Sequence, residues 1–241
     1  MALIFHVSDL HFGAEDGAAL AWFAQQVETQ RPDAVVVTGD LTMRARRREF
    51  RAAEDWLCAL PVPVSVEVGN HDLPYFNLFA RFTDPYRRFK GLEKQFERPL
   101  DLPGVDVIPL RTTARLQWRF NWSKGYLTSA RVADAEAALL RASGPMRLIA
   151  CHHPLVEPGT RGTAHTRGGV RALATLVRAG ARAVLSGHVH DPYDTTMMVE
   201  GMPVRLIGAG TLSERVRDSA PSYNAITASA EDLKVEARYA S

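Results

Sequence analysis

Apolar runs typical of buried strands alternate with amphipathic stretches of helical period along the first three quarters of the chain. Such alternation is typical of βαβ units and predicts an α/β protein with a mostly parallel sheet. The predicted strands span residues 3–7, 34–37, 62–68, 105–110, 147–151 and 183–185. The predicted helices span residues 17–30, 44–59, 129–141 and 169–179.

The C-terminal third has a different pattern, in which short apolar segments follow one another across turns such as Glu200-Gly201. These segments, 195–199, 204–207, 223–228 and 233–239, predict antiparallel hairpins or a meander. Residues 75–102, rich in aromatic residues and arginine, predict a helical excursion between two strands. Because no stretch has the composition of a linker, we expect a single domain over residues 1–241.

Composition and charge exclude several classes of protein. The chain has 46% apolar and 23% charged residues and a formal net charge of +2, which argues against a disordered chain and against nucleic-acid binding. No apolar stretch approaches about 18 residues, so we expect no membrane partner. The first residues predict a strand and not a signal peptide, and the two cysteines suit a reducing compartment. We therefore expect a cytoplasmic protein.

Polar clusters stand where five of the predicted strands end. In open α/β sheets, ligands bind beyond the carboxyl ends of the strands, so these clusters are candidates for one shared site. They are Ser8-Asp9-Leu10-His11, Thr38-Gly39-Asp40-Leu41, Gly69-Asn70-His71-Asp72, His152-His153-Pro154 and Ser186-Gly187-His188-Val189-His190.

Taken singly, most of these clusters have an ordinary structural explanation, such as a capping aspartate beside a surface histidine. The last cluster is more specific, because His188 and His190 would lie on one side of an extended segment, about 6–7 Å apart. Together, the clusters gather oxygen and nitrogen ligands of the kind that suit Zn, Mn, Fe or Co. The sequence therefore predicts a metal centre.

In order and spacing, the five motifs resemble those of the calcineurin-like metallophosphoesterases, and within that family the chain is most similar to compact bacterial class III cyclic-nucleotide phosphodiesterases. The resemblance implies a four-layer α/β/β/α sandwich of two mixed sheets. It also implies that Asp40 bridges two metal ions of the Mn, Fe or Zn type. The implied first-metal ligands are Asp9, His11 and His190, and the implied second-metal ligands are Asn70, His152 and His188.

The resemblance further implies that His71 stands near the leaving-group oxygen and that Asp72 orients it. Two metal ions can clamp an in-line displacement at phosphorus and acidify a bridging hydroxide. Counting two metal ions, two aspartates and a hydroxide leaves a site charge of roughly +1, which favours a phosphodiester monoanion. We therefore expect a metal-dependent hydrolase of small, cyclic nucleotide-like phosphodiesters. A DNA exonuclease or phosphomonoesterase, and a non-catalytic scaffold, are the alternatives.

Several features stay open at this stage. The loop of residues 158–169 makes His165 and Arg167 candidate substrate-binding residues beside Asn70 and His71. His153 is a candidate for orienting a neighbouring imidazole. A homodimer is left open. Two further groups each have a binding and a structural explanation: the arginines Arg44, Arg46, Arg47, Arg48 and Arg51, and the aromatics Trp118, Phe120 and Trp122.

Overall fold

Strands and helices alternate from the N-terminus to β6 in the computed structural model, which describes residues 1–74, 77–96, 100–114, 121 and 123–240. The helices are α1 (Gly17–Gln30), α2 (Arg47–Ala59), α3 (Leu78–Thr83), α4 (Arg87–Phe96), α5 (Ser129–Arg141) and α6 (Gly169–Arg178). The strands are β1 (Ala2–Val7), β2 (Ala34–Val37), β3 (Val64–Val66), β4 (Val105–Pro109), β5 (Met146–Ala150), β6 (Ala183–Ser186), β7 (Tyr193–Val199), β8 (Met202–Gly208), β9 (Ser222–Ala228) and β10 (Leu233–Tyr239).

The strands form two mixed sheets instead of the mostly parallel sheet that the strand–helix alternation predicts. One five-stranded sheet has the order β10-β9-β1-β2-β3 and the other has the order β4-β5-β6-β8-β7. In the first sheet β1, β2 and β3 are parallel, and the β9–β10 hairpin pairs with β1 in the antiparallel sense. In the second sheet β4, β5, β6 and β8 are parallel, and β7 is an antiparallel edge strand. The two-sheet arrangement is the one that the family resemblance implies.

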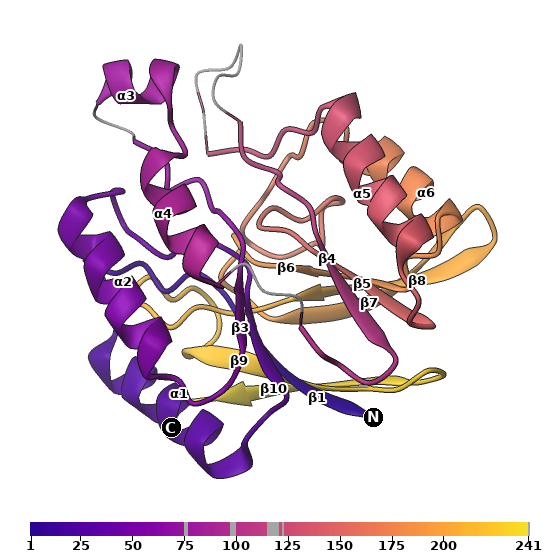
Figure 1. The fold of residues 1–241 in the computed structure, drawn as a ribbon, viewed down its shortest axis with the longest axis horizontal. Helices are drawn as coiled ribbons and strands as arrows, with labels where there is room; N and C mark the ends of the chain where they lie inside the picture. The colour runs from indigo at the N-terminus through magenta and orange to yellow at the C-terminus, as the bar shows by residue number, and fades with distance from the viewer. Residues whose placement is uncertain (75–76, 97–99, 115–120, 122, 241) are drawn as a thin grey trace.

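The two sheets pack face to face, with α1, α2 and α4 covering one outer face and α5 and α6 the other (Figure 1). The alternation of side chains along β1 explains this arrangement. Phe5 and Val7 pack against the helices, whereas Ala2 and Ile4 pack against the second sheet. Because both faces of the strand are buried, the strand is apolar throughout instead of alternating between apolar and polar residues.

Local capping explains where the helices begin. The side chain of Asp16 accepts hydrogen bonds at the start of α1, and Thr128 does the same for α5, so both helices have the predicted bounds. Helix α2 begins three residues later than predicted. There the buried carboxylate of Glu49 accepts hydrogen bonds from the backbone of Arg44 and Arg46, and Ala45 takes a positive φ of 51°.

The C-terminal strands are two hairpins and not one meander, because they belong to different sheets. β7 and β8 are joined by Glu200 and Gly201, both with positive φ, as expected for a tight two-residue turn. The predicted helical excursion contains α3 and α4. No helix in the described ranges is long and apolar enough to cross a membrane. The aromatics Trp118, Phe120 and Trp122 lie outside the described residues.

Candidate metal centre

All five polar clusters lie where the carboxyl edges of the two sheets meet. β1, β2 and β3 run parallel in one sheet, and β5 and β6 run parallel in the other, so each group of strands ends at one edge. The two edges face each other, because Nε2 of His152, after β5, lies 3.4 Å from Oδ2 of Asp40, after β2. The structure therefore brings the predicted residues into one site.

The backbone at this edge is strained. Five of the predicted ligands have a positive φ, a backbone conformation that residues other than glycine rarely adopt. Such conformations cost free energy and persist where the surrounding structure imposes them, typically at functional sites. The five are Asp9, His11, Asp40, His188 and His190, with φ between 47° and 70°.

Glycines allow the loops to approach closely. A Cβ atom at Gly187 would lie 1.8 Å from Oγ of Ser8 and 2.6 Å from Oδ2 of Asp9. A Cβ atom at Gly69 would lie 2.1 Å from both the backbone nitrogen and Oδ1 of Asp40. Any other residue at these positions would push apart the loops that carry the aspartates.

The first group of acceptor atoms comes from Asp9, His11 and His190, all of them buried. Nδ1 of His190 lies 2.7 Å from the carbonyl oxygen of Arg215 and donates a hydrogen bond to it. When the ring is neutral, its lone pair is therefore on Nε2. That Nε2 faces Oδ1 of Asp9 at 3.1 Å and Nε2 of His11 at 3.2 Å. One carboxylate oxygen and two imidazole nitrogens thus face one another.

The second group consists of Asp40, Asn70, His152 and His188. Nδ1 of His152 donates to the carbonyl oxygen of Thr38 at 2.8 Å, so its Nε2 faces Oδ1 of Asn70 at 3.1 Å and Asp40. The ring of His188 lies 5.2 Å from that of His152, centroid to centroid. Asp40 also lies next to the first group, with Oδ2 at 3.8 Å from Nε2 of His11, so it can serve both groups.

The electrostatics of the site favour ionised aspartates and divide the histidines. Burial lowers the pKa of His11 and His188, whereas Asp9 outweighs burial and raises the pKa of His190. Burial opposes ionisation of Asp9, but His190 and its neighbours hold the pKa of that carboxyl well below its usual range. The same competition, with His152 as the main partner, lowers the pKa of Asp40. Burial lowers the pKa of His188 and keeps it neutral, whereas Asp40 overcomes burial and raises the pKa of His152 to about 9. A metal ion binding here would displace that proton.

These atoms fit a pair of divalent cations. The buried Oδ1 of Asp9 has no hydrogen bond of regular geometry among the described residues. It faces imidazole nitrogens, those of His190 at 3.1 Å and His11 at 3.6 Å, and a buried anionic oxygen is costly without a cation beside it. Converging carboxylate, amide and imidazole acceptors are the donor set of borderline-hard transition metals. The arrangement could hold one cation between Asp9, His11, His190 and Asp40, and a second between Asp40, Asn70, His152 and His188.

His153 is held by other contacts, although it lies beside two proposed ligands. Its Nε2 is 2.8 Å from the carbonyl oxygen of Ser123, and its Nδ1 is 2.9 Å from Oγ1 of Thr112. Burial and His152 lower the pKa of His153 to about 3, so the ring is neutral, donates to Ser123 and accepts from Thr112. Both nitrogens are therefore occupied, and His153 fixes the segment that carries Ser123 against the site.

His71 lines the cavity described below, and no hydrogen bond between its ring and Asp72 is found in the part of the chain that the structure describes, although the resemblance implies that Asp72 orients His71. Nδ1 of His71 lies 2.7 Å from the carbonyl oxygen of Met43. The carboxylate of Asp72 instead accepts hydrogen bonds from the backbone of Leu41, Thr42 and Gly69. The carboxylate therefore joins the loops after β2 and β3. Burial and Asp40 raise its pKa to about 7.

A cavity of about 210 Å³ opens above these residues. Neither His165 nor Arg167 is among the residues that line it, so their role as substrate-binding residues stays a prediction. His165 lies 3.5 Å from Glu157, and the guanidinium of Arg167 lies over the ring of Tyr126. The five arginines near α2 do not line it either. The lining residues are Asp40, Asn70, His71, Ser123, Lys124, Arg161, Thr163, His188, His190, Arg215 and Arg217.

Arg215 is the most informative residue that the sequence analysis missed. Its Nη1 lies 3.0 Å from Nε2 of His71 and 3.4 Å from Nε2 of His11. Its carbonyl oxygen is the acceptor that fixes His190. Nothing near Arg215 in the sequence marks it, whereas Arg161 and Thr163 belong to the loop that the analysis did single out.

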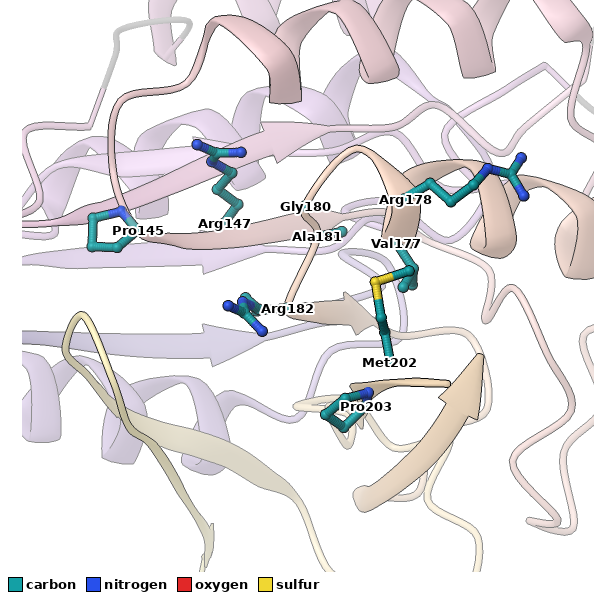
Figure 2. A pocket seen from close by; sticks show the side chains of 9 residues that line it. All are labelled: Pro145, Arg147, Val177, Arg178, Gly180, Ala181, Arg182, Met202 and Pro203. Atoms are coloured by element: carbon teal, nitrogen blue, oxygen red, sulfur yellow. The ribbon is translucent and has the colours of Figure 1, made fainter. Parts of the chain in front are cut away.

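A second cavity, of about 350 Å³, lies at the opposite edge of the second sheet, where β5, β6 and β8 begin (Figure 2). Three arginines line it, but Figure 2 shows that their guanidinium groups point in different directions. Arg147 donates to the carbonyl oxygens of Gly144 and Ala142. Arg178 forms an ion pair with Glu200, 2.7 Å away. These two arginines serve the fold.

Comparisons with known proteins agree with this geometry. A family model described as calcineurin-like phosphoesterase matches residues 2–192. The chain is 30% identical over 168 residues to a glycerophosphodiester phosphodiesterase of Enterobacter lignolyticus, covering 65% of this chain and 58% of that protein. It is 26% identical over 229 residues to a cAMP/cGMP dual specificity phosphodiesterase of Mycobacterium tuberculosis, covering 86% of this chain and 67% of that protein. The chain therefore spans less than two thirds of the first relative.

Solved structures share the fold. A dimetal phosphatase from Danio rerio superposes with a TM-score of 0.70 at 15% identity, covering 99% of this chain and 96% of that one. A purple acid phosphatase from yellow lupin superposes with the same TM-score and identity, covering 99% of this chain and 51% of that one. At this identity the likeness establishes the four-layer architecture and nothing about substrate.

Proposed function

The chain belongs to the calcineurin-like phosphoesterase family, and we propose that it is a dinuclear metal-dependent phosphodiesterase that acts on small phosphodiesters. The observation that carries the proposal is the position of Asp40 at the base of a basic cavity, with its Oδ2 3.8 Å from Nε2 of His11 and 3.4 Å from Nε2 of His152. Asp9, His11, His190 and Asp40 would hold one cation, and Asp40, Asn70, His152 and His188 the other. Such a pair supplies Lewis acidity at the phosphate and lowers the pKa of the attacking water.

The chain itself positions the ligands before any cation binds. Backbone carbonyls of Thr38 and Arg215 fix the rings of His152 and His190 so that Nε2 faces the site in both. Hydrogen bonds of this kind raise the basicity of the imidazole and set its orientation. Asp40 adds a second constraint, because its Oδ1 accepts from the backbone nitrogen of His71 at 2.7 Å.

His71 is the group that would move a proton. Because its Nδ1 donates to Met43, its Nε2 is the atom that faces the cavity and accepts from Arg215. Nε2 can take up a proton from solvent only after the Arg215 guanidinium turns away from it. A phosphate oxygen of the substrate would be the new hydrogen-bond acceptor of that guanidinium. His71 would then donate that proton to the departing oxygen.

The charge of the site supports a diester as substrate. Two dications held by two carboxylates, with Arg215 beside them, favour an anion at the reacting centre. A monoanionic diester needs one proton or positive neighbour for the alkoxide to leave, and His71 and Arg215 provide these. The two curated relatives carry the names of phosphodiesterases, which supports the same choice.

The test compares a diester and a monoester that have the same leaving group, 4-nitrophenolate. Metal-stripped protein, reloaded separately with Mn²⁺, Fe²⁺ and Zn²⁺, is assayed on bis(4-nitrophenyl) phosphate and on 4-nitrophenyl phosphate. We expect the higher kcat/KM for the diester. A higher value for the monoester under every metal would overturn the diester assignment. Cyclic AMP, glycerophosphodiesters and single-stranded DNA then identify the preferred class of diester.

A further inference from the structure

The cavity above the proposed metal centre has more positive charge than one phosphodiester needs. Besides Arg215, it is lined by Lys124, Arg161 and Arg217. The one carboxylate among its lining residues is Asp40, which the proposed cations would use. An additional group of cations on one side of an active site is the usual means of binding a second anionic group.

The segments that carry these cations are fixed to one another. Nζ of Lys124 donates to the carbonyl oxygen of Thr163 at 2.6 Å and to its Oγ1 at 2.9 Å. Ser123, next to Lys124, is held by His153. The segment of residues 123–124 and the loop of residues 158–169 therefore form a connected rim beside the metal ligands.

Arg217 points into this rim. A Cβ atom at Gly162 would lie 2.7 Å from Nη1 of Arg217, so the guanidinium packs directly against the backbone between Arg161 and Thr163. No ion pair of Arg217 is found among the described residues. Glycine at position 162 leaves the space that the guanidinium occupies.

Arg161 brings a second guanidinium to the same place. Its Nη1 lies 3.4 Å from Asp218, and both side chains are mostly exposed, at 74% and 61%. Exposed ion pairs of this kind contribute little free energy, so an anionic ligand could replace Asp218 at small cost. Arg161 and Arg217 thus line the same cavity as Arg215.

We propose that Arg161 and Arg217 form a subsite for a phosphate monoester on the substrate, next to the diester that is cleaved. The proposal rests on the proposed function and narrows it to small diesters that carry a second phosphate. Guanidinium groups bind the oxygens of a phosphate dianion in forked, charge-assisted pairs. Because Arg161, Arg215 and Arg217 line one cavity of about 210 Å³, the two phosphate groups would lie close together on the substrate, which favours a small substrate over a polymer.

The first experiment compares two diesters that differ by one phosphate. These are the 5′-(4-nitrophenyl) ester of thymidine 5′-monophosphate and the same compound with a 3′-phosphate. With metal-loaded protein we expect the 3′-phosphate to raise kcat/KM roughly tenfold, the scale of one charge-assisted hydrogen bond. In the double variant Arg161→Ala, Arg217→Ala, the ratio of the two kcat/KM values should fall to near one.

Arg182→Ala is the matched control, because it removes an arginine from the cavity at the opposite edge of the sheet. This variant should keep the ratio of the unchanged protein. Arg217→Lys should keep part of the advantage of the 3′-phosphate, because the positive charge remains but the bidentate hydrogen bonding of the guanidinium is lost. No advantage from the 3′-phosphate in the unchanged protein, or an advantage that survives in the double variant, would overturn the subsite.

A binding measurement separates this proposal from the proposed function. Calorimetry gives the Kd of thymidine 3′,5′-bisphosphate and of thymidine 5′-monophosphate for the unchanged protein and the double variant. We expect the bisphosphate to bind roughly tenfold more tightly to the unchanged protein only. That result without hydrolysis of either ester would keep the subsite and reject the diesterase. Equal affinities would reject the subsite, and tighter binding of a thymidine oligonucleotide would assign the rim to nucleic acid instead.

Discussion

Two arginine-lined cavities lie at opposite edges of the same sheet, and the smaller one has the chemistry of an active site. The cavity at the amino edge, about 350 Å³, is lined by Arg147, Arg178 and Arg182, of which the first two donate to the chain's own carbonyls and carboxylates. The cavity at the carboxyl edge, about 210 Å³, has Arg215 facing the imidazoles of His71 and His11. The comparison shows that unsatisfied, converging polar atoms identify a site better than its volume does.

The difference has a backbone origin. At the amino edge, β5 and β6 begin a few residues after α5 and α6, and Arg147 donates to a carbonyl oxygen near the end of α5. At the carboxyl edge, loops with positive φ turn Asp9, Asp40 and His190 toward one another. The strained residues of these loops are the ones whose side chains converge. Arg147 and Arg178, at the amino edge, instead stabilise the fold through contacts with neighbouring residues.

The largest effect should come from Asp40→Asn, which keeps a hydrogen-bond acceptor for the backbone nitrogen of His71 but removes the shared charge. We expect the loss of at least one of two bound metal ions and the abolition of diester hydrolysis. Metal analysis of the purified protein and the assay on bis(4-nitrophenyl) phosphate check this. Two bound ions with normal turnover in this variant would remove Asp40 from the centre.

His71→Ala should have the next largest effect. We expect both metals to stay bound and kcat to fall by roughly 10²–10⁴, the scale of a lost general acid. The loss should be smaller for nitrophenyl esters than for alkyl esters, because a nitrophenolate departs without a proton. Equal losses for the two kinds of leaving group, measured under matched metal loading, would assign His71 a different role.

Arg215→Gln should lower kcat/KM for the diester by about 10–100-fold, the scale of a lost hydrogen bond to a charged group, without changing the metal content. The reason is that the guanidinium lies 3.0 Å from Nε2 of His71 and could donate hydrogen bonds to the phosphate of the substrate when His71 donates its proton. Arg215→Lys should recover part of the loss. Kinetics of both variants, with metal analysis, test this; a change in metal content with unchanged kcat/KM would show a structural role.

The smallest effect on activity should come from the amino edge. Arg147→Ala removes hydrogen bonds to the carbonyl oxygens of Gly144 and Ala142 and should lower the free energy of unfolding by about 1–2 kcal/mol. Its kcat/KM should stay within about twofold of the unchanged protein. Urea unfolding and the diester assay measure the two quantities. A large loss of activity at full stability would mean that this edge takes part in function.

Much of the fold could be predicted from local pattern. α1 and α5 have the predicted bounds because amphipathic period and a capping side chain act over neighbouring residues. β3 is shorter than predicted, Val64–Val66 in place of residues 62–68, because only these residues pair with β2. Pairing between strands depends on residues far away in the chain, so the apolar run alone overstates the strand.

The sequence by itself determined which residues could serve a metal centre, because Asp9, His11, Asp40, Asn70, His152, His188 and His190 stand in short motifs at strand ends. Only the tertiary structure decided that Asp72 joins two loops and that Arg215 meets His71 across 144 residues of chain. The physical reason is the reach of each signal. A motif is a local pattern, whereas the neighbour of a side chain at the meeting edge of two sheets depends on how distant loops pack against each other.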